Sequence, residues 1–239
     1  RLLPETVGQE QAGIYAQAFR VLDAVSMFGV LVAGLLLPIF AKMLIQKEAI
    51  GPMVKLSFTL LMVPAIVVAV SSIFYDTEIM EVLYHSNTAH SSELLGILMT
   101  GFVGIATTYI FGTLLTANGS IKHLNLMALG GMILNVSLNF VLIPKYLAFG
   151  SAYASLTTQI LTGIAQALLA MHIFKLKADF RVILQFVFFA IAVIGLAFVS
   201  QYFDNWIFGY AFLLLTSLLA GFALRLINLK ELFKIIQTR

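Results

Sequence analysis

Two side chains of opposite charge, Arg20 and Asp23, lie three residues apart inside a long apolar segment, "GIYAQAFRVLDAVSMFGVLVAGLLLP" at residues 13–38. Ionised side chains near the centre of a membrane-spanning helix are costly, at roughly 2.5–3.5 kcal/mol each. Residues at this spacing are close on a helix surface, so we expect them to form an ion pair. Gln17 and Ser26 extend the polar positions in both directions. We therefore expect this strip to face protein or trapped water rather than lipid.

The charged pair has two interpretations. It can hold its helix against a neighbour, or Arg20 can bind an anionic substrate while Asp23 holds the guanidinium in place. A guanidinium suits that role because its planar fork binds phosphate oxygens in pairs and stays charged. We favour substrate binding because ionisable groups inside membranes are usually functional. Asp23 is also a candidate proton or sodium site, although an adjacent Arg should keep it ionised.

The composition places these residues in a membrane protein. Of the 239 residues, 61% are hydrophobic and 10% are charged, whereas about 25% are charged in a soluble domain. A helix needs about 20 apolar residues to cross a bilayer. We therefore expect an all-α, polytopic membrane bundle of about seven transmembrane helices, without a soluble domain. The predicted spans are roughly 13–40, 53–75, 94–117, 122–143, 149–174, 182–202 and 206–227.

The basic residues are distributed unevenly between the predicted connections. Eleven of the fourteen fall on one set of alternate connections: Lys42, Lys47, Lys55, Lys122, Lys175, Lys177, Arg181, Arg225, Lys230, Lys234 and Arg239. The other set holds Arg1 and Lys145. Because cytoplasmic connections carry the excess of Lys and Arg, we expect a cytoplasmic C-terminus. The net charge of +3, spread along the chain, does not favour a nucleic-acid partner.

Further polar side chains lie within the predicted spans. Asn135 and Asn139 are four residues apart on one helix face, and Gln159 belongs to a stripe of small and polar residues on the next helix. Such residues line cavities or hold helices together through hydrogen bonds, and the two interpretations are equally open here. The chain has no Cys, and its four His residues lack a metal-ligand spacing. We therefore expect neither a bound metal nor a cofactor.

Several stretches resemble, in order, the bacterial polysaccharide flippases of the multidrug, oligosaccharidyl-lipid and polysaccharide exporter superfamily. "GIYAQAFRVLDAV" followed by "LLPIFAKM" resembles one of their helices, and "LLTANGSIKHLNLM" resembles an inner turn. "NVSLNFVLIPKYLAFGSAYASLTTQI" resembles a later helix pair. The resemblance extends to about residue 175. His85 and Leu147 stand where the family pattern has Gly.

The resemblance implies two six-helix lobes around a central cavity that holds the substrate. Residues 1–175 would form the C-terminal lobe without its first helix, and residues 176–239 two additional helices and a cytoplasmic tail. Arg20 matches an arginine of the lipid II flippase that faces the cavity, where basic residues meet the pyrophosphate. The resemblance therefore implies a substrate site around Arg20. Together with the polar positions above, the candidate substrate-binding residues are Arg20, Asp23, Gln17, Asn135, Asn139 and Gln159.

The expected function is transport rather than catalysis. The chain would move a polyprenyl-pyrophosphate-linked oligosaccharide across the bacterial cytoplasmic membrane, for lipopolysaccharide or other cell-surface polysaccharide biosynthesis. Transport would require the missing N-terminal lobe, and sodium or protons could be the coupling ion.

Three alternatives remain open. A multidrug or cation exporter of the same superfamily needs an acidic cavity site, and Asp23 is the one acidic residue within the predicted spans. A membrane polymerase or transferase needs paired acidic residues for a metal and a diphosphate, but the sequence has no DxD or DDxxD motif. A purely structural membrane subunit would seal its helices around a neutralised Arg20–Asp23 pair.

Overall fold

The computed structural model describes residues 3–84, 88–177, 179–224 and 226. Within these ranges it consists of helices without strands: α1 (Glu5–Ile45), α2 (Gly51–Phe74), α3 (Asp76–Leu83), α4 (Thr88–Ala117), α5 (Ile121–Tyr146), α6 (Ala148–Phe174), α7 (Phe180–Ser200) and α8 (Trp206–Ala223). All except α3 are long and apolar enough to cross a membrane. The predicted all-α fold and its seven spans are confirmed, and the chain is a multi-pass membrane protein.

The helix α3 was not predicted from the sequence. It lies in the connection between α2 and α4 and has only eight residues, of which Met80 is fully buried. Asp76 is its first residue, and its carboxylate accepts hydrogen bonds from the backbone N–H of Thr77 at 2.6 Å and from the Thr77 hydroxyl at 3.0 Å. Acidic residues in a first helical turn also interact favourably with the helix dipole. A helix of this length is too short to produce a hydropathy signal.

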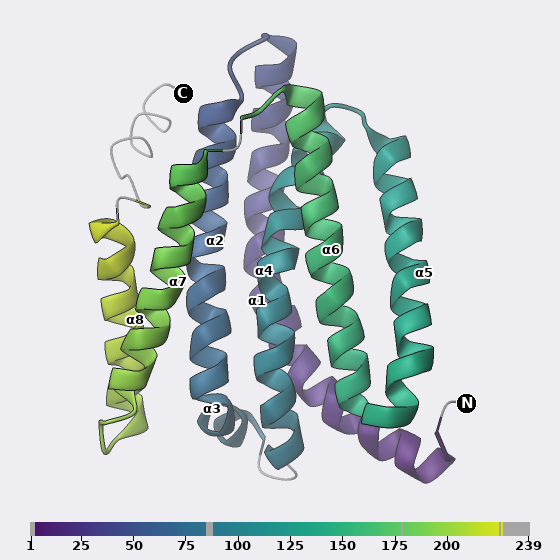
Figure 1. The fold of residues 1–239 in the computed structure, drawn as a ribbon, viewed down its shortest axis with the longest axis vertical. Helices are drawn as coiled ribbons and strands as arrows, with labels where there is room; N and C mark the ends of the chain where they lie inside the picture. The colour runs from purple at the N-terminus through teal and green to yellow at the C-terminus, as the bar shows by residue number, and fades with distance from the viewer. Residues whose placement is uncertain (1–2, 85–87, 178, 225, 227–239) are drawn as a thin grey trace.

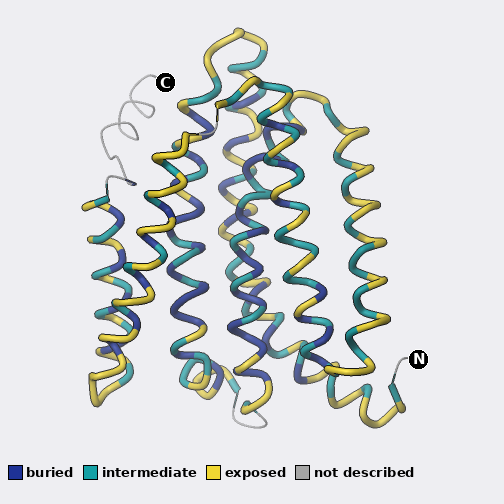
Figure 2. Tube along the Cα trace, in the orientation of Figure 1, coloured by how far each residue is buried: buried dark blue, intermediate teal, exposed yellow. Residues whose placement is uncertain are grey.

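The long helices run side by side in one bundle, with α4 at its centre (Figure 1). α4 packs most extensively against α6 and α1, and then against α2. α5 packs mainly against the far side of α6 and has no buried residues. Figure 2 shows this contrast, because buried positions follow α2 and α4 while α5 is exposed or intermediate along its length. The edge of the bundle formed by α5 is therefore the least buried part of it.

Bare glycine surfaces let α4 and α6 approach closely. A Cβ atom added at Gly104 would lie 2.7 Å from the backbone C and O of Gln159. A Cβ added at Gly163 would lie 2.7 Å from the carbonyl oxygen of Gly104. Both distances are shorter than any normal contact, so this interface requires Gly at these two positions. Small residues of this kind typically allow close helix packing in membranes.

The last two helices pack against α2 and form a hydrophobic cluster separate from the main core. At one end, the side-chain amide of Gln201 donates to the carbonyl oxygen of Phe74 at 2.9 Å. At the other end, Lys55 Nζ lies 3.7 Å from Asp179 Oδ2. The division of the chain at residue 175 stays a prediction. The predicted tail, like Arg1 and His85, lies outside the described residues.

The junction between α5 and α6 has an unusual backbone conformation. Leu147 has φ 55° and ψ −130°, a region that favours glycine. Its N–H donates to the carbonyl of Ile143 at 2.8 Å, and its own carbonyl accepts from Gly150 N–H at 3.1 Å. Such conformations cost of order 1–3 kcal/mol in a non-glycine residue. A glycine at this position would therefore fit this backbone without strain.

Candidate functional site: the polar faces of α1, α5 and α6

Arg20 lies on the outward face of α1. Ala18 and Leu22, two residues to either side, are fully buried, because this side of α1 packs on α4. Two residues correspond to about 200° around a helix, so Arg20 points away from α4. Arg20 and Asp23 are both exposed. The guanidinium is therefore presented outside the packed core of this bundle.

The predicted ion pair between Arg20 and Asp23 is absent. Both residues lie within the ranges that the structure describes, and their charged groups do not approach within 4.0 Å. Exposed ion pairs gain little free energy, so nothing compels these two side chains to meet. Asp23 instead lies close to Tyr109 of α4, whose side chain also interacts with Ser26. The spacing in the sequence predicted the proximity of the two residues but not the orientation of their side chains.

Gln17 faces a different neighbourhood from Arg20. It is half-buried, and its Oε1 atom is buried without a hydrogen-bond partner among the described residues. Its backbone carbonyl accepts from the hydroxyl of Tyr84 at 3.4 Å. The polar strip of α1 therefore divides, because Gln17 and Ser26 turn toward other helices while Arg20 turns outward.

Asn135 and Asn139 connect α5 to α6. The Nδ2 atom of Asn139 donates to Asn135 Oδ1 at 2.9 Å, and Asn135 Nδ2 donates to the Thr158 hydroxyl at 3.4 Å. Thr158 in turn donates to the carbonyl oxygen of Ala154 at 2.8 Å. Asn139 Oδ1 is buried and, within the described part of the chain, has no hydrogen-bond donor. The pair thus joins α5 to α6 through a hydrogen bond and retains one unused oxygen.

Gln159 lies in the interface between α4 and α6. A Cβ at Gly101 would overlap its Oε1 atom, so the amide occupies the space that this glycine leaves open. Gln166, two turns further along α6, makes a similar approach to Gly112, where a Cβ would lie 2.7 Å from the Gln166 Oε1 atom. This pattern favours packing as the role of Gln159.

The six predicted site residues therefore do not form one cluster in this bundle. Arg20 and Asp23 share an exposed face of α1, Asn135 and Asn139 lie with α6, and Gln159 faces α4. Sequence reasoning missed Tyr109, the α4 residue beside this polar face. Gly29 on α1 leaves space for the Tyr109 ring, which a Cβ there would overlap, but a glycine in the sequence does not indicate which residue of another helix faces it.

Sequence reasoning also missed an apolar groove between α1, α2 and α8. Its volume is about 370 Å³, and its walls include Phe28 of α1, Pro64 and Val67 of α2, and Leu214 and Leu218 of α8. It was unpredictable because it depends on where α8 docks against helices distant in the sequence.

The described residues include no group of three or more His, Cys, Asp or Glu side chains that could hold a metal ion. Comparison of the sequence with protein-family models, with curated proteins and with solved structures gives no significant match.

Proposed function

We propose that this chain is part of a flippase that moves a polyprenyl-pyrophosphate-linked oligosaccharide across the bacterial cytoplasmic membrane, with its C-terminus in the cytoplasm. The observation that carries the proposal is the outward position of Arg20 on a membrane-spanning helix. A guanidinium facing acyl chains would be costly, and among the described residues none forms an ion pair with it. Arg20 therefore requires a polar surface outside this bundle, which a cavity shared with a second lobe would provide.

The apolar groove between α1, α2 and α8 supports a lipid-linked substrate. Phe28, on the same helix as Arg20, lies in its wall. A ligand with a diphosphate head and an isoprenoid tail needs a cationic contact and an apolar surface within reach of one another. In this proposal Arg20 binds the diphosphate in the cavity, and the tail lies along the groove at the lipid boundary.

A coupling ion would find oxygen ligands between α5 and α6. Asn135 Oδ1, the Thr158 hydroxyl and the unused Asn139 Oδ1 belong to one hydrogen-bonded cluster. Neutral oxygens suit a hard cation, and the cluster has no group that titrates at ordinary pH. The donor set thus favours sodium over a proton and favours this cluster over Asp23.

A cation exporter of the same superfamily is the second candidate. Asp23 is exposed and not paired with Arg20, so its carboxylate is available to a cationic ligand. The other two alternatives are less well supported. A transferase would need clustered acidic residues, which the described part of the chain lacks, and a sealed structural bundle would need the neutralised pair.

The experiment uses the complete protein in cells that depend on it for surface polysaccharide. Arg20→Ala should abolish export of the lipid-linked sugar at normal membrane abundance. Arg20→Lys should restore only part of it, because an ammonium cannot make the bidentate contact. Normal export by Arg20→Ala would contradict the diphosphate role.

Two further variants separate the remaining possibilities. Loss of drug efflux in Asp23→Asn, with Arg20→Ala unaffected, would indicate the cation exporter. Asn139→Leu, which keeps the side-chain size, should change the sodium dependence of transport while Arg20→Ala should not.

A further inference from the structure

A second groove, of about 590 Å³, lies between α2, α4, α6 and α7. Its walls are almost entirely apolar and include Phe58, Phe111, Ile164, Leu168 and Val182. The four helices that line it lie side by side in Figure 1, with α6 and α7 in front of α2 and α4. It is separate from the groove beside α8 and from the polar face of α1. None of the residues named for transport lines it.

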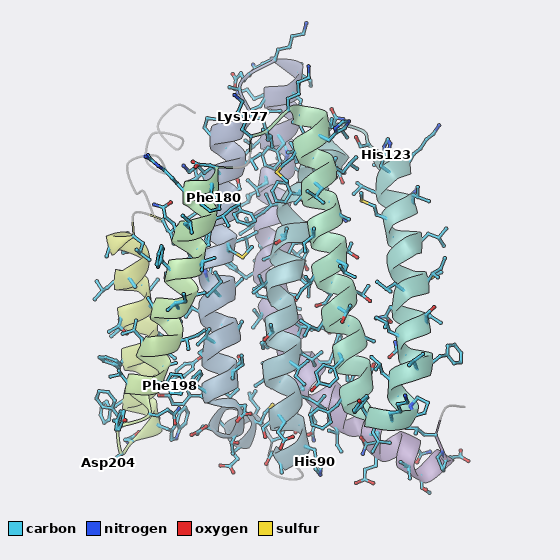
Figure 3. All side chains as sticks on the ribbon, viewed as in Figure 1. His90, His123, Lys177, Phe180, Phe198 and Asp204 are labelled. Carbon is cyan, nitrogen blue, oxygen red and sulfur yellow. The ribbon has the colours of Figure 1, made fainter. Side chains whose placement is uncertain are left out.

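We call this groove the α6–α7 groove. One of its ends is charged. Lys55 lies in the first turns of α2, and Lys177 and Asp179 lie in the connection between α6 and α7. Figure 3 places Lys177 and Phe180 at this same end of the bundle. The end is therefore at the level where the helices finish, whereas the apolar walls lie at the depth of the spans.

The charges at this end are not balanced. Asp179 Oδ2 lies 3.7 Å from Lys55 Nζ, and both side chains are more than half exposed. Asp179 Oδ1 also accepts from the backbone N–H of Arg181 at 3.1 Å and caps the start of α7. Lys177 has no ion-pair partner within 4.0 Å in the described ranges. A positive charge is therefore available directly beside the apolar walls.

We propose that the α6–α7 groove binds an anionic phospholipid, with an acyl chain along the apolar walls and the phosphate at Lys55 and Lys177. The acyl chain would lie against the apolar walls at the depth of the spans. The phosphate would lie at the helix ends, where basic residues attract anionic head groups. A volume of this size is typical of small-molecule sites. An apolar partner helix would gain nothing from the lysines, and a zwitterionic lipid would bring its own cation to them. The proposal does not depend on the transported substrate.

A tryptophan reporter tests the proposal. Trp206 is the only tryptophan in the chain, so Trp206→Phe combined with Leu168→Trp leaves one indole at the groove wall. The protein is reconstituted in phosphatidylcholine vesicles with added brominated phosphatidylglycerol or brominated phosphatidylcholine. Brominated phosphatidylglycerol should quench this indole more strongly at equal concentration. Adding K55Q and K177Q should reduce the preference of the groove for phosphatidylglycerol over phosphatidylcholine on the order of 10- to 30-fold.

A matched reporter controls for general lipid contact. Leu126 on α5 is 69% exposed, lies about as far from its helix end as Leu168, and does not line the groove. In Leu126→Trp with Trp206→Phe, the two lysine changes should leave quenching unaltered. As a second measurement, K55Q/K177Q should lose phosphatidylglycerol retained in native mass spectrometry, whereas K42Q/K122Q should keep it. Equal quenching by both brominated lipids, or quenching unchanged by K55Q/K177Q, would overturn the proposal, as would crosslinking of another helix or a second copy into the groove.

Discussion

The hydroxyl of Tyr75, just after α2, lies 2.8 Å from the hydroxyl of Ser200 and 3.1 Å from its carbonyl oxygen, at the end of α7. Both residues are almost completely buried, although 125 positions separate them. The Tyr75 ring also meets Tyr210 of α8 edge to face, with centroids 5.3 Å apart. One side chain therefore ties the last two helices to the rest of the bundle.

We predict that Tyr75→Phe lowers the free energy of unfolding by about 1–3 kcal/mol, because it leaves buried Ser200 oxygens without a donor. The variant keeps the ring and its contact with Tyr210. Ser200→Ala should cost less, since the Ser200 carbonyl still accepts from Tyr75. Thermal or denaturant unfolding in detergent measures both. Equal stability of Tyr75→Phe and the parent protein would show that the hydroxyl contributes nothing.

Gly104→Ala should lower the free energy of unfolding by about 1–3 kcal/mol, the usual effect of overpacking. The added methyl group would meet backbone atoms of Gln159 and Ile160, which cannot rotate away as a side chain would. Gly130→Ala on α5 is the matched control, because, apart from the backbone of its own helix turn, no described residue has an atom within 4 Å of its added Cβ. That control should be neutral or stabilising by up to about 1 kcal/mol through helix propensity. Similar unfolding of the two variants would contradict the close packing of α4 on α6.

Leu147→Gly should be more stable than Leu147→Ala by about 1 kcal/mol. Both variants remove the same side-chain contacts, but only Gly adopts the positive φ of this junction without strain. Chemical denaturation of the pair measures the difference directly. If Ala proves the more stable, the backbone at this junction does not have the conformation described.

A double-mutant cycle on Arg20 and Asp23 should give a coupling free energy below about 0.5 kcal/mol. The two charged groups do not approach within 4.0 Å, so Arg20→Gln and Asp23→Asn should add independently. Unfolding of the complete protein supplies the four free energies. A coupling well above 1 kcal/mol would restore the ion pair that the sequence suggested and would weaken the case for a free guanidinium.

The spans could be predicted because hydropathy and length are properties of one segment at a time. The bounds of α1 were less predictable. It starts at Glu5 rather than near residue 13, since its first turns cross below the start of α6 (Figure 1), where Gln11 Oε1 accepts from Ala148 N–H at 3.2 Å. Such an extension depends on a contact with a distant helix, which hydropathy does not contain.

The candidate site was predictable only in part. The exposure of Arg20 follows from its place opposite Ala18 and Leu22. The role of Gln159 could not be predicted, because it depends on which residue of α4 faces it. That register is set by Gly101 and Gly104, more than fifty residues earlier in the chain. A polar residue in a span therefore has no assigned role until its facing helix is known.

The bare contact between α4 and α6 limits how the bundle can rearrange. Sliding α4 by one helical turn, about 5.4 Å, would bring Thr100 or Thr108 to the level of Gly104. Their branched side chains would collide with the backbone at Gln159, which already leaves no room for a methyl group. The two helices must consequently move as a single rigid body. In the transport cycle that we propose, opening and closing would then have to occur outside this pair, for example at α5, which packs mainly against α6 alone, while the central pair serves as the fixed frame.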